Sequence, residues 1–143
     1  MFFRKTILLF FLFISLLTAT QAQERELWMD YERMQVILDK HIDEVKGETG
    51  NWELRHHEQV LFVMCDSTNN RMRIFTPIIE EAHLKKGELE AMLNANFHSA
   101  LDAKYSLYEG FVLSVYTHPL KELTEAQLLS AMGQVINLSL IHI

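Results

Sequence analysis

The sequence predicts an α+β domain in which helices pack on an antiparallel sheet of about five strands. Apolar residues recur every three to four positions in three segments, which is typical of amphipathic helices. Five shorter segments have the composition of strands, and the connections between neighbouring strands are too short for the crossovers that parallel strands need. The predicted element order is α-β-β-β-α-β-β-α.

The first predicted helix covers residues 24–45. Its apolar side chains share one helix face, at Leu27, Tyr31, Met34, Leu38, Ile42 and Val45. The Gly-containing segment 46–51 ends this helix, and the first strands follow it.

The five predicted strands are joined in antiparallel hairpins. They are residues 52–55, 60–65, 71–75, 103–108 and 111–116. Segment 66–70 and the pair Glu109-Gly110 have the composition of turns, which favours hairpin connections.

Two further helices complete the domain. Residues 86–97 place Leu89, Met92, Leu93 and Phe97 on one side. The last helix begins at Thr124, because Thr124 and Gln127 have the spacing of a capping box. Its predicted buried stripe is Leu128, Leu129, Met132, Val135 and Ile136.

Residues 1–22 have the pattern of a secretory signal peptide. Arg4 and Lys5 precede a nearly unbroken apolar run, and Thr20 and Ala22 occupy the small-residue positions before a mature end at Gln23. The alternative, an uncleaved anchor, needs about 20 apolar residues, and this run has roughly a dozen. We therefore predict a bacterial protein that is exported, periplasmic or secreted, with no stable membrane insertion after cleavage.

The last six residues, 138–143, match the translation of an adapter used in transposon-based sequencing libraries. This match predicts that the tail is foreign, and that the natural domain covers residues 23–137 and continues beyond Asn137. The alternative is an ordinary apolar helix end.

Several segments resemble the class I type III secretion chaperone-like superfamily, which includes the YbjN-like proteins. They are residues 92–97, the two strands around Tyr105 and Val112, and the step from His118-Pro119-Leu120 into residues 123–128. The resemblance implies a fold that commonly dimerises and binds other polypeptides without catalysis. Such chaperones are cytoplasmic, so for a chain with an export signal the resemblance does not imply secretion-chaperone function.

The strand at residues 60–65 is apolar at every position, whereas a sheet with one wet face alternates. Both faces of this strand therefore need cover. We predict that Val60, Phe62 and Met64 bind a polypeptide partner or a second copy of the chain in a homodimer. The alternative is that residues 80–93 cover these three side chains.

Charge and composition exclude other classes of function. The net charge of −6 leaves no basic face for nucleic acid. His56, His57 and Glu58 do not predict a metal site, because adjacent residues of a strand point to opposite faces. The sequence shows no Gly-rich phosphate loop and no other cofactor motif.

No catalytic constellation is visible, so we predict a protein that is not an enzyme. Cys65 is the only cysteine, and in an apolar strand such a residue is typically a small buried hydrophobe. One alternative stays open, namely a small exported enzyme or ligand-binding protein whose site forms from dispersed residues such as His56, Asn96 and His118.

Overall fold

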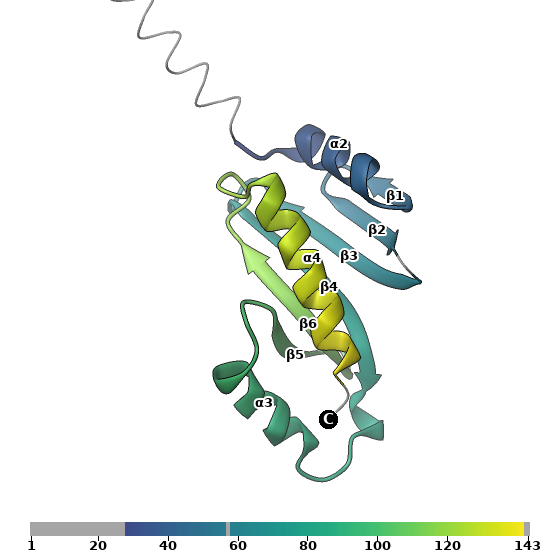
Figure 1. Ribbon diagram of the computed structural model, residues 1–143, viewed down its shortest axis with the longest axis vertical. Helices are drawn as coiled ribbons and strands as arrows, with labels where there is room; N and C mark the ends of the chain where they lie inside the picture. Colours follow the sequence, from purple (N-terminus) through teal and green to yellow (C-terminus); the bar gives the residue numbers. More distant parts are fainter. Residues whose placement is uncertain (1–27, 57, 142–143) are drawn as a thin grey trace, which may run out of the picture.

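The computed structural model of the chain describes residues 28–56 and 58–141. Within them, one six-stranded antiparallel sheet carries three α-helices, in the order α-β-β-β-β-α-β-β-α (Figure 1). The predicted α+β class is confirmed. The elements are α2 (Tyr31–His41), β1 (Glu44–Glu48), β2 (Asn51–His56), β3 (Gln59–Asp66), β4 (Arg71–Glu80), a short 3-10 helix (Glu81–His83), α3 (Glu88–His98), β5 (Lys104–Tyr108), β6 (Phe111–His118) and α4 (Glu125–Leu140).

The strands lie in the order β1-β2-β3-β4-β6-β5, and every neighbouring pair is antiparallel. Tight two-residue loops close two of the hairpins, β1–β2 and β5–β6. Their residues, Thr49-Gly50 and Glu109-Gly110, all have positive φ, which is the geometry of a type I′ turn. Gly50 also lies against the Tyr31 ring, where an added Cβ would be 3.0 Å from Cε1.

The predicted helix over residues 24–45 is too long at both ends, since residues 28–30 are not helical and Asp30 is the N-cap of α2. The helix ends at His41, Ile42 is extended, and the sixth strand, β1, occupies Glu44–Glu48. Ile42 is buried and Val45 packs against the core from β1, so both fit the helical spacing without being helical. Residues 24–27 lie outside the described residues.

Strand β4 continues past the predicted end at Phe75 to Glu80. Pro77 lies inside this extension, although proline cannot donate to a strand ladder. In the structure the pairing of β4 with β6 shifts register between Pro77 and Ile79. This bulge accommodates the proline inside the sheet.

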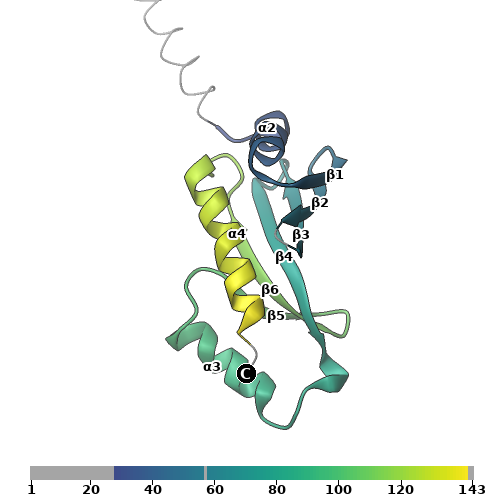
Figure 2. The same ribbon diagram turned by 45° about the vertical axis from the view of Figure 1, so that its right-hand side comes forward.

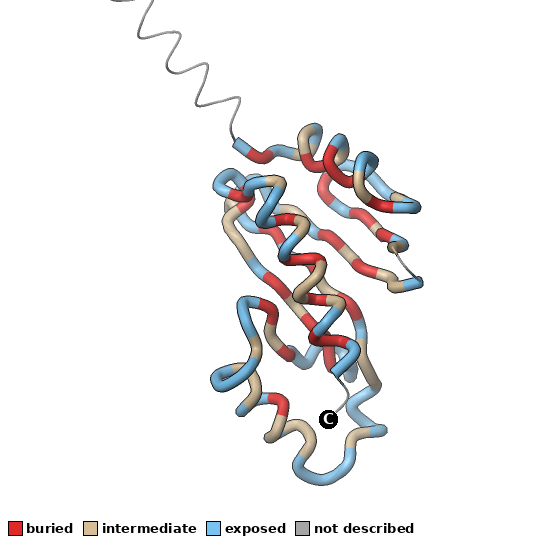
Figure 3. Tube along the Cα trace, in the orientation of Figure 1, coloured by how far each residue is buried: buried red, intermediate tan, exposed pale blue. Residues whose placement is uncertain are grey.

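The helices α2 and α4 lie on one face of the sheet (Figures 1 and 2). Helix α4 packs on β4 and β6, α2 packs on β1, and α3 contacts β5. Alternate residues of the strands form the core below the helices (Figure 3). They include Trp52, Leu54, Leu61, Val63, Met72, Ile74, Val112 and Tyr116.

The capping box that starts α4 is confirmed. The Gln127 N–H donates to Thr124 Oγ1, and the Thr124 N–H donates to Gln127 Oε1. From the predicted stripe, Leu128, Met132 and Val135 are buried. Helix α4 continues through residues 138–140, the first part of the predicted foreign tail. The predicted signal peptide, residues 1–22, lies outside the described residues.

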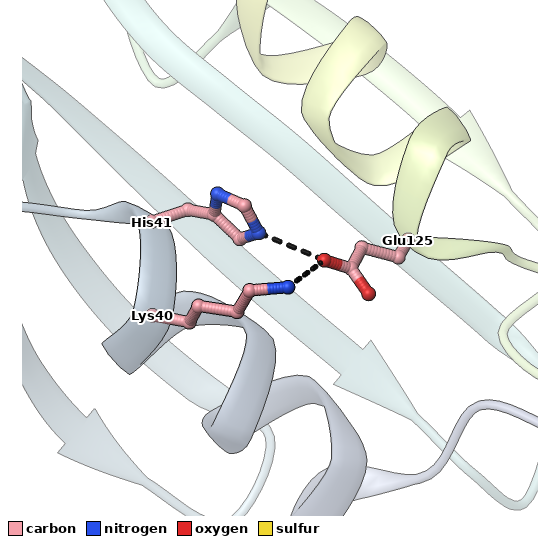
Figure 4. A network of polar contacts seen from close by, with 3 residues as sticks. All are labelled: Lys40, His41 and Glu125. Atoms are coloured by element: carbon pink, nitrogen blue, oxygen red, sulfur yellow. Dashed lines mark hydrogen bonds and ion pairs between the residues drawn. The ribbon is translucent and has the colours of Figure 1, made fainter.

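Helices α2 and α4 are joined by one carboxylate (Figure 4). Lys40 Nζ and His41 Nε2 each lie 2.8 Å from Glu125 Oε1. The hydrogen bond from Lys40, and next the one from His41, lower the pKa of Glu125. Glu125 lies in the first turn of α4 and the two basic groups in the last turn of α2, so each charge is also favourable for its own helix dipole.

Among the helices that the structure describes, none is long and apolar enough to cross a membrane.

Candidate functional site

The sheet face that points away from α2 and α4 carries apolar side chains from three central strands. They are Val60, Phe62 and Met64 of β3, Phe75 and Pro77 of β4, and Leu113 and Val115 of β6. None of these seven residues belongs to the buried core cluster. We call this surface the open face, because no described helix covers it (Figure 2).

Strand register brings these side chains together. Phe62 is paired with Phe75, and Phe75 is paired with Val115. The rings of Phe62 and Phe75 stack with their centroids 5.4 Å apart and their planes 24° from parallel. Cross-strand aromatic and β-branched pairs of this kind stabilise a sheet, and here they also make a continuous apolar ladder.

The structure places the three predicted binding residues on this one face. Val60 and Phe62 are half-buried, and Met64 is 46% exposed. Residues 80–93 do not cover them, because that segment contributes Leu84 and Met92 to the core on the other side of the sheet. Their role in binding a partner stays a prediction.

Sequence reasoning missed four members of the open face, namely Phe75, Pro77, Leu113 and Val115. For residues 111–116 the sequence predicted a strand without a binding role. One signal in the sequence could have shown that β6 contributes to the open face. Its alternate residues Phe111, Leu113 and Val115 are all large and apolar, whereas a solvated sheet face normally carries polar side chains.

A shallow groove of about 400 Å³ runs over one part of the open face. Its volume is at the lower end of the range for ligand-binding pockets. Leu113 is only 7% exposed, while Tyr108 at the β5 end is 61% exposed. The lining residues are Met64, Arg73, Phe75, Ser106, Tyr108, Leu113 and Val115.

Charged residues on the same sheet face gather on β1 and β2, beside the apolar part. Lys46 pairs with Glu44 at 2.9 Å, and Arg55 pairs with Glu53 at 3.2 Å and with Glu44 at 3.6 Å. Arg73 differs from Lys46 and Arg55, since it forms no ion pair with any described residue. It lies close enough to Asp66 to contribute to the lowered pKa of that carboxyl, which is caused mainly by hydrogen bonds from Asn69.

Cys65 lies on the opposite side of β3, toward the helices, and packs against the core. Burial raises the pKa of its thiol to about 12. A cysteine nucleophile needs a lowered pKa, so this environment opposes covalent catalysis.

The structure does not bring His56, Asn96 and His118 into one site. His56 Nδ1 lies 3.2 Å from Asp43 Oδ2 at the β2–β3 hairpin, whereas His118 is paired with Met72 at the other end of the sheet. The Asn96 side chain bonds the backbone of Tyr105 in β5. The open alternative of a site built from these three residues is therefore contradicted by their positions.

Within residues 28–56 and 58–141, no three His, Cys, Asp or Glu side chains are placed to hold a metal ion. His57, one of the three residues of the sequence motif, lies outside this description.

Comparisons with known proteins agree with the architecture. No protein-family model and no curated protein sequence matches the chain. Solved structures do match, each at 15% identity. They include the ExsC-ExsE complex (TM-score 0.51, 62% of this chain and 69% of that chain), the HopA1-SchA chaperone-effector complex (0.55, 80% and 88%) and the Yersinia pestis type III secretion chaperone SycH with a fragment of YscM2 (0.53, 73% and 94%).

The chain is thus structurally similar to class I type III secretion chaperones. At this identity the likeness concerns the fold. The fold that the sequence resemblance implied is confirmed, while the YbjN-like grouping and export remain predictions.

Proposed function

We propose that this chain is an exported, non-enzymatic protein-binding domain that holds a polypeptide partner on its open face. The observation that carries the proposal is the apolar ladder of Phe62, Phe75 and Val115 on a sheet face that no described helix covers. A contiguous apolar surface on a soluble domain is typical of an interaction site.

The apolar ladder lies on a sheet face that no described helix covers (Figure 2). An apolar side chain on a solvated sheet face gains little from folding, but burying it against a partner is worth about 25 cal/mol per Å² of apolar area removed from water. Flat sheet faces of this kind suit an extended or helical segment better than a small molecule, which needs a concave site.

The structural neighbours support a polypeptide as the partner class. One of them is a chaperone-effector complex, and another is a secretion chaperone in complex with a fragment of a second protein. Export is supported by the pattern of residues 1–22, which would bring this chain to its partner outside the cytoplasm.

Binding can be tested with the protein purified from the periplasm after expression of the full chain. We expect it to bind an unfolded model polypeptide, reduced and carboxymethylated lactalbumin, and to lose this binding in Phe62→Asp. The matched control is Leu107→Asp. Leu107 is also an exposed apolar strand residue. It lies two residues after the core residue Tyr105 on β5, so its side chain points to the side of the sheet opposite the open face.

Light scattering on the same samples gives the oligomeric state. A dimer that Phe62→Asp dissociates would assign the open face to a second copy of the chain. A monomer that binds lactalbumin equally well with and without Phe62→Asp would contradict the proposal. Recovery of the chain only in the cytoplasm would contradict export.

A further inference from the structure

The groove on the open face has at one end the guanidinium of Arg73, which forms no ion pair with any residue that the structure describes. We propose that this groove selects polypeptide segments in which an apolar residue and an acidic residue are separated by one position, and that Arg73 pairs with the acidic side chain. This inference rests on the proposed function and specifies the partner of the same surface.

The spacing follows from strand geometry. Arg73 lies two residues before Phe75 on β4, so the two side chains point to the same face about 7 Å apart. An extended peptide lying along β4 and β6 repeats its own side chains at the same interval. When its apolar side chain rests on Phe75 and Val115, the side chain two residues along reaches Arg73.

The charge preference follows from the partners of the neighbouring cations. Lys46 and Arg55 are already paired with glutamates. Lys104 lies next to the groove, because it is paired with Val115 across β5 and β6. Its Nζ, however, donates to the backbone carbonyls of Asn96, Ala100 and Leu101, in and just after the last turn of α3. Arg73 is left exposed beside apolar surface, where it is available to a carboxylate of the partner.

Asp66 does not fulfil this role. Its carboxylate accepts hydrogen bonds from the backbone and the side chain of Asn69, at 3.0 and 2.7 Å, and it forms no ion pair with Arg73. The net charge of −6 repels an acidic peptide at long range, but screening removes most of this repulsion beyond about 8 Å at physiological ionic strength. The group at the groove therefore determines the preference.

The test uses acetylated peptides in which Leu alternates with Ser, except that one central Leu is replaced by Asp, Asn or Lys. The central residue then points to the same side as the flanking leucines. Fluorescence anisotropy measures their affinity for the full chain. We expect the Asp peptide to bind about threefold more tightly than the Asn peptide and the Lys peptide to bind most weakly, since an exposed ion pair has an effect of this size.

Charge reversal separates pairing from structure. In Arg73→Glu we expect the order to invert, so that the Lys peptide binds most tightly. Arg55→Glu is the matched control, because Arg55 lies on the same sheet face but outside the groove, and it should leave the order unchanged. High salt should reduce the differences among the peptides without abolishing binding.

The outcomes distinguish this inference from the proposed function. Binding of all three peptides with one affinity, or an order that Arg73→Glu does not change, overturns the inference and leaves polypeptide binding in place. Failure of every peptide to bind overturns both. Self-association that is lost in Arg73→Glu assigns the groove to a second copy and also overturns the inference.

Discussion

Phe62 and Phe75 stack across β3 and β4 on the side of the sheet away from the helices, with ring centroids 5.4 Å apart. Two large aromatic side chains on this face gain from each other but remain partly in contact with water. The arrangement differs from the core side of the same strands, where Leu61, Val63 and Ile74 are completely buried. Neighbouring residues of β3 therefore serve different purposes.

Stability measurements should separate the two sides of β3. Leu61→Ala removes a fully buried side chain and should lower the free energy of unfolding by about 2–5 kcal/mol. Phe62→Ala should cost about 1 kcal/mol, because the side chain is only half-buried and leaves no enclosed cavity. Urea unfolding followed by circular dichroism checks both values. Equal losses for the two variants would mean that the open face is covered in solution.

Much of the fold could be predicted because local signals agreed with it. Glu109-Gly110 indicated a tight turn, and Thr124 and Gln127 indicated the start of α4, both of which the structure contains. The first strand was missed because Ile42 and Val45 continue the spacing of α2 into a segment that faces the same core. Periodicity alone does not separate a helix from a short strand in that position.

The candidate site could be predicted in part. A run that is apolar at every position, from Val60 to Cys65, indicated a strand that needs cover on both sides. The partners of Phe62 on the open face depend on strand order, since β4 pairs with β6 across a 30-residue interval that contains α3 and β5. Neither Phe75 nor Arg73 could be assigned to the site without that pairing.

The outer edge of β5 is protected by the side chain of Asn96. Asn96 Oδ1 accepts from the Tyr105 N–H at 2.7 Å, and Asn96 Nδ2 donates to the Tyr105 carbonyl at 3.0 Å, as a neighbouring strand would. We expect Asn96→Ala to cost about 1–3 kcal/mol and to accelerate amide exchange at Tyr105. Asn94→Ala, at an exposed position of α3, is the control. Unchanged exchange at Tyr105 would show that this contact is not maintained in solution.

The thiol of Cys65 should be nearly inert in the folded protein. Its pKa is raised to about 12 by burial, so the thiolate that reacts with disulfide reagents is scarce at pH 8. We expect slow labelling by Ellman's reagent that becomes fast in denaturing urea. Rapid labelling of the native protein at pH 8 would show that Cys65 is accessible and would reopen the question of its reactivity.

The link between α2 and α4 should make stability depend on pH in the acidic range. The hydrogen bonds from Lys40 and His41 lower the pKa of Glu125 in the folded state, so its contribution is complete above the ordinary value of 4.5 and is lost as pH falls through the lower folded-state pKa. We expect Glu125→Gln to reduce Tm at pH 7 and to reduce it progressively less as pH falls below 4.5. The control is Glu48→Gln, which should change Tm little at pH 7 or pH 3. Glu48 is an exposed carboxylate on β1 that forms no ion pair with any described residue. A Tm difference between wild type and Glu125→Gln that is as large at pH 3 as at pH 7 would contradict the role of this carboxylate.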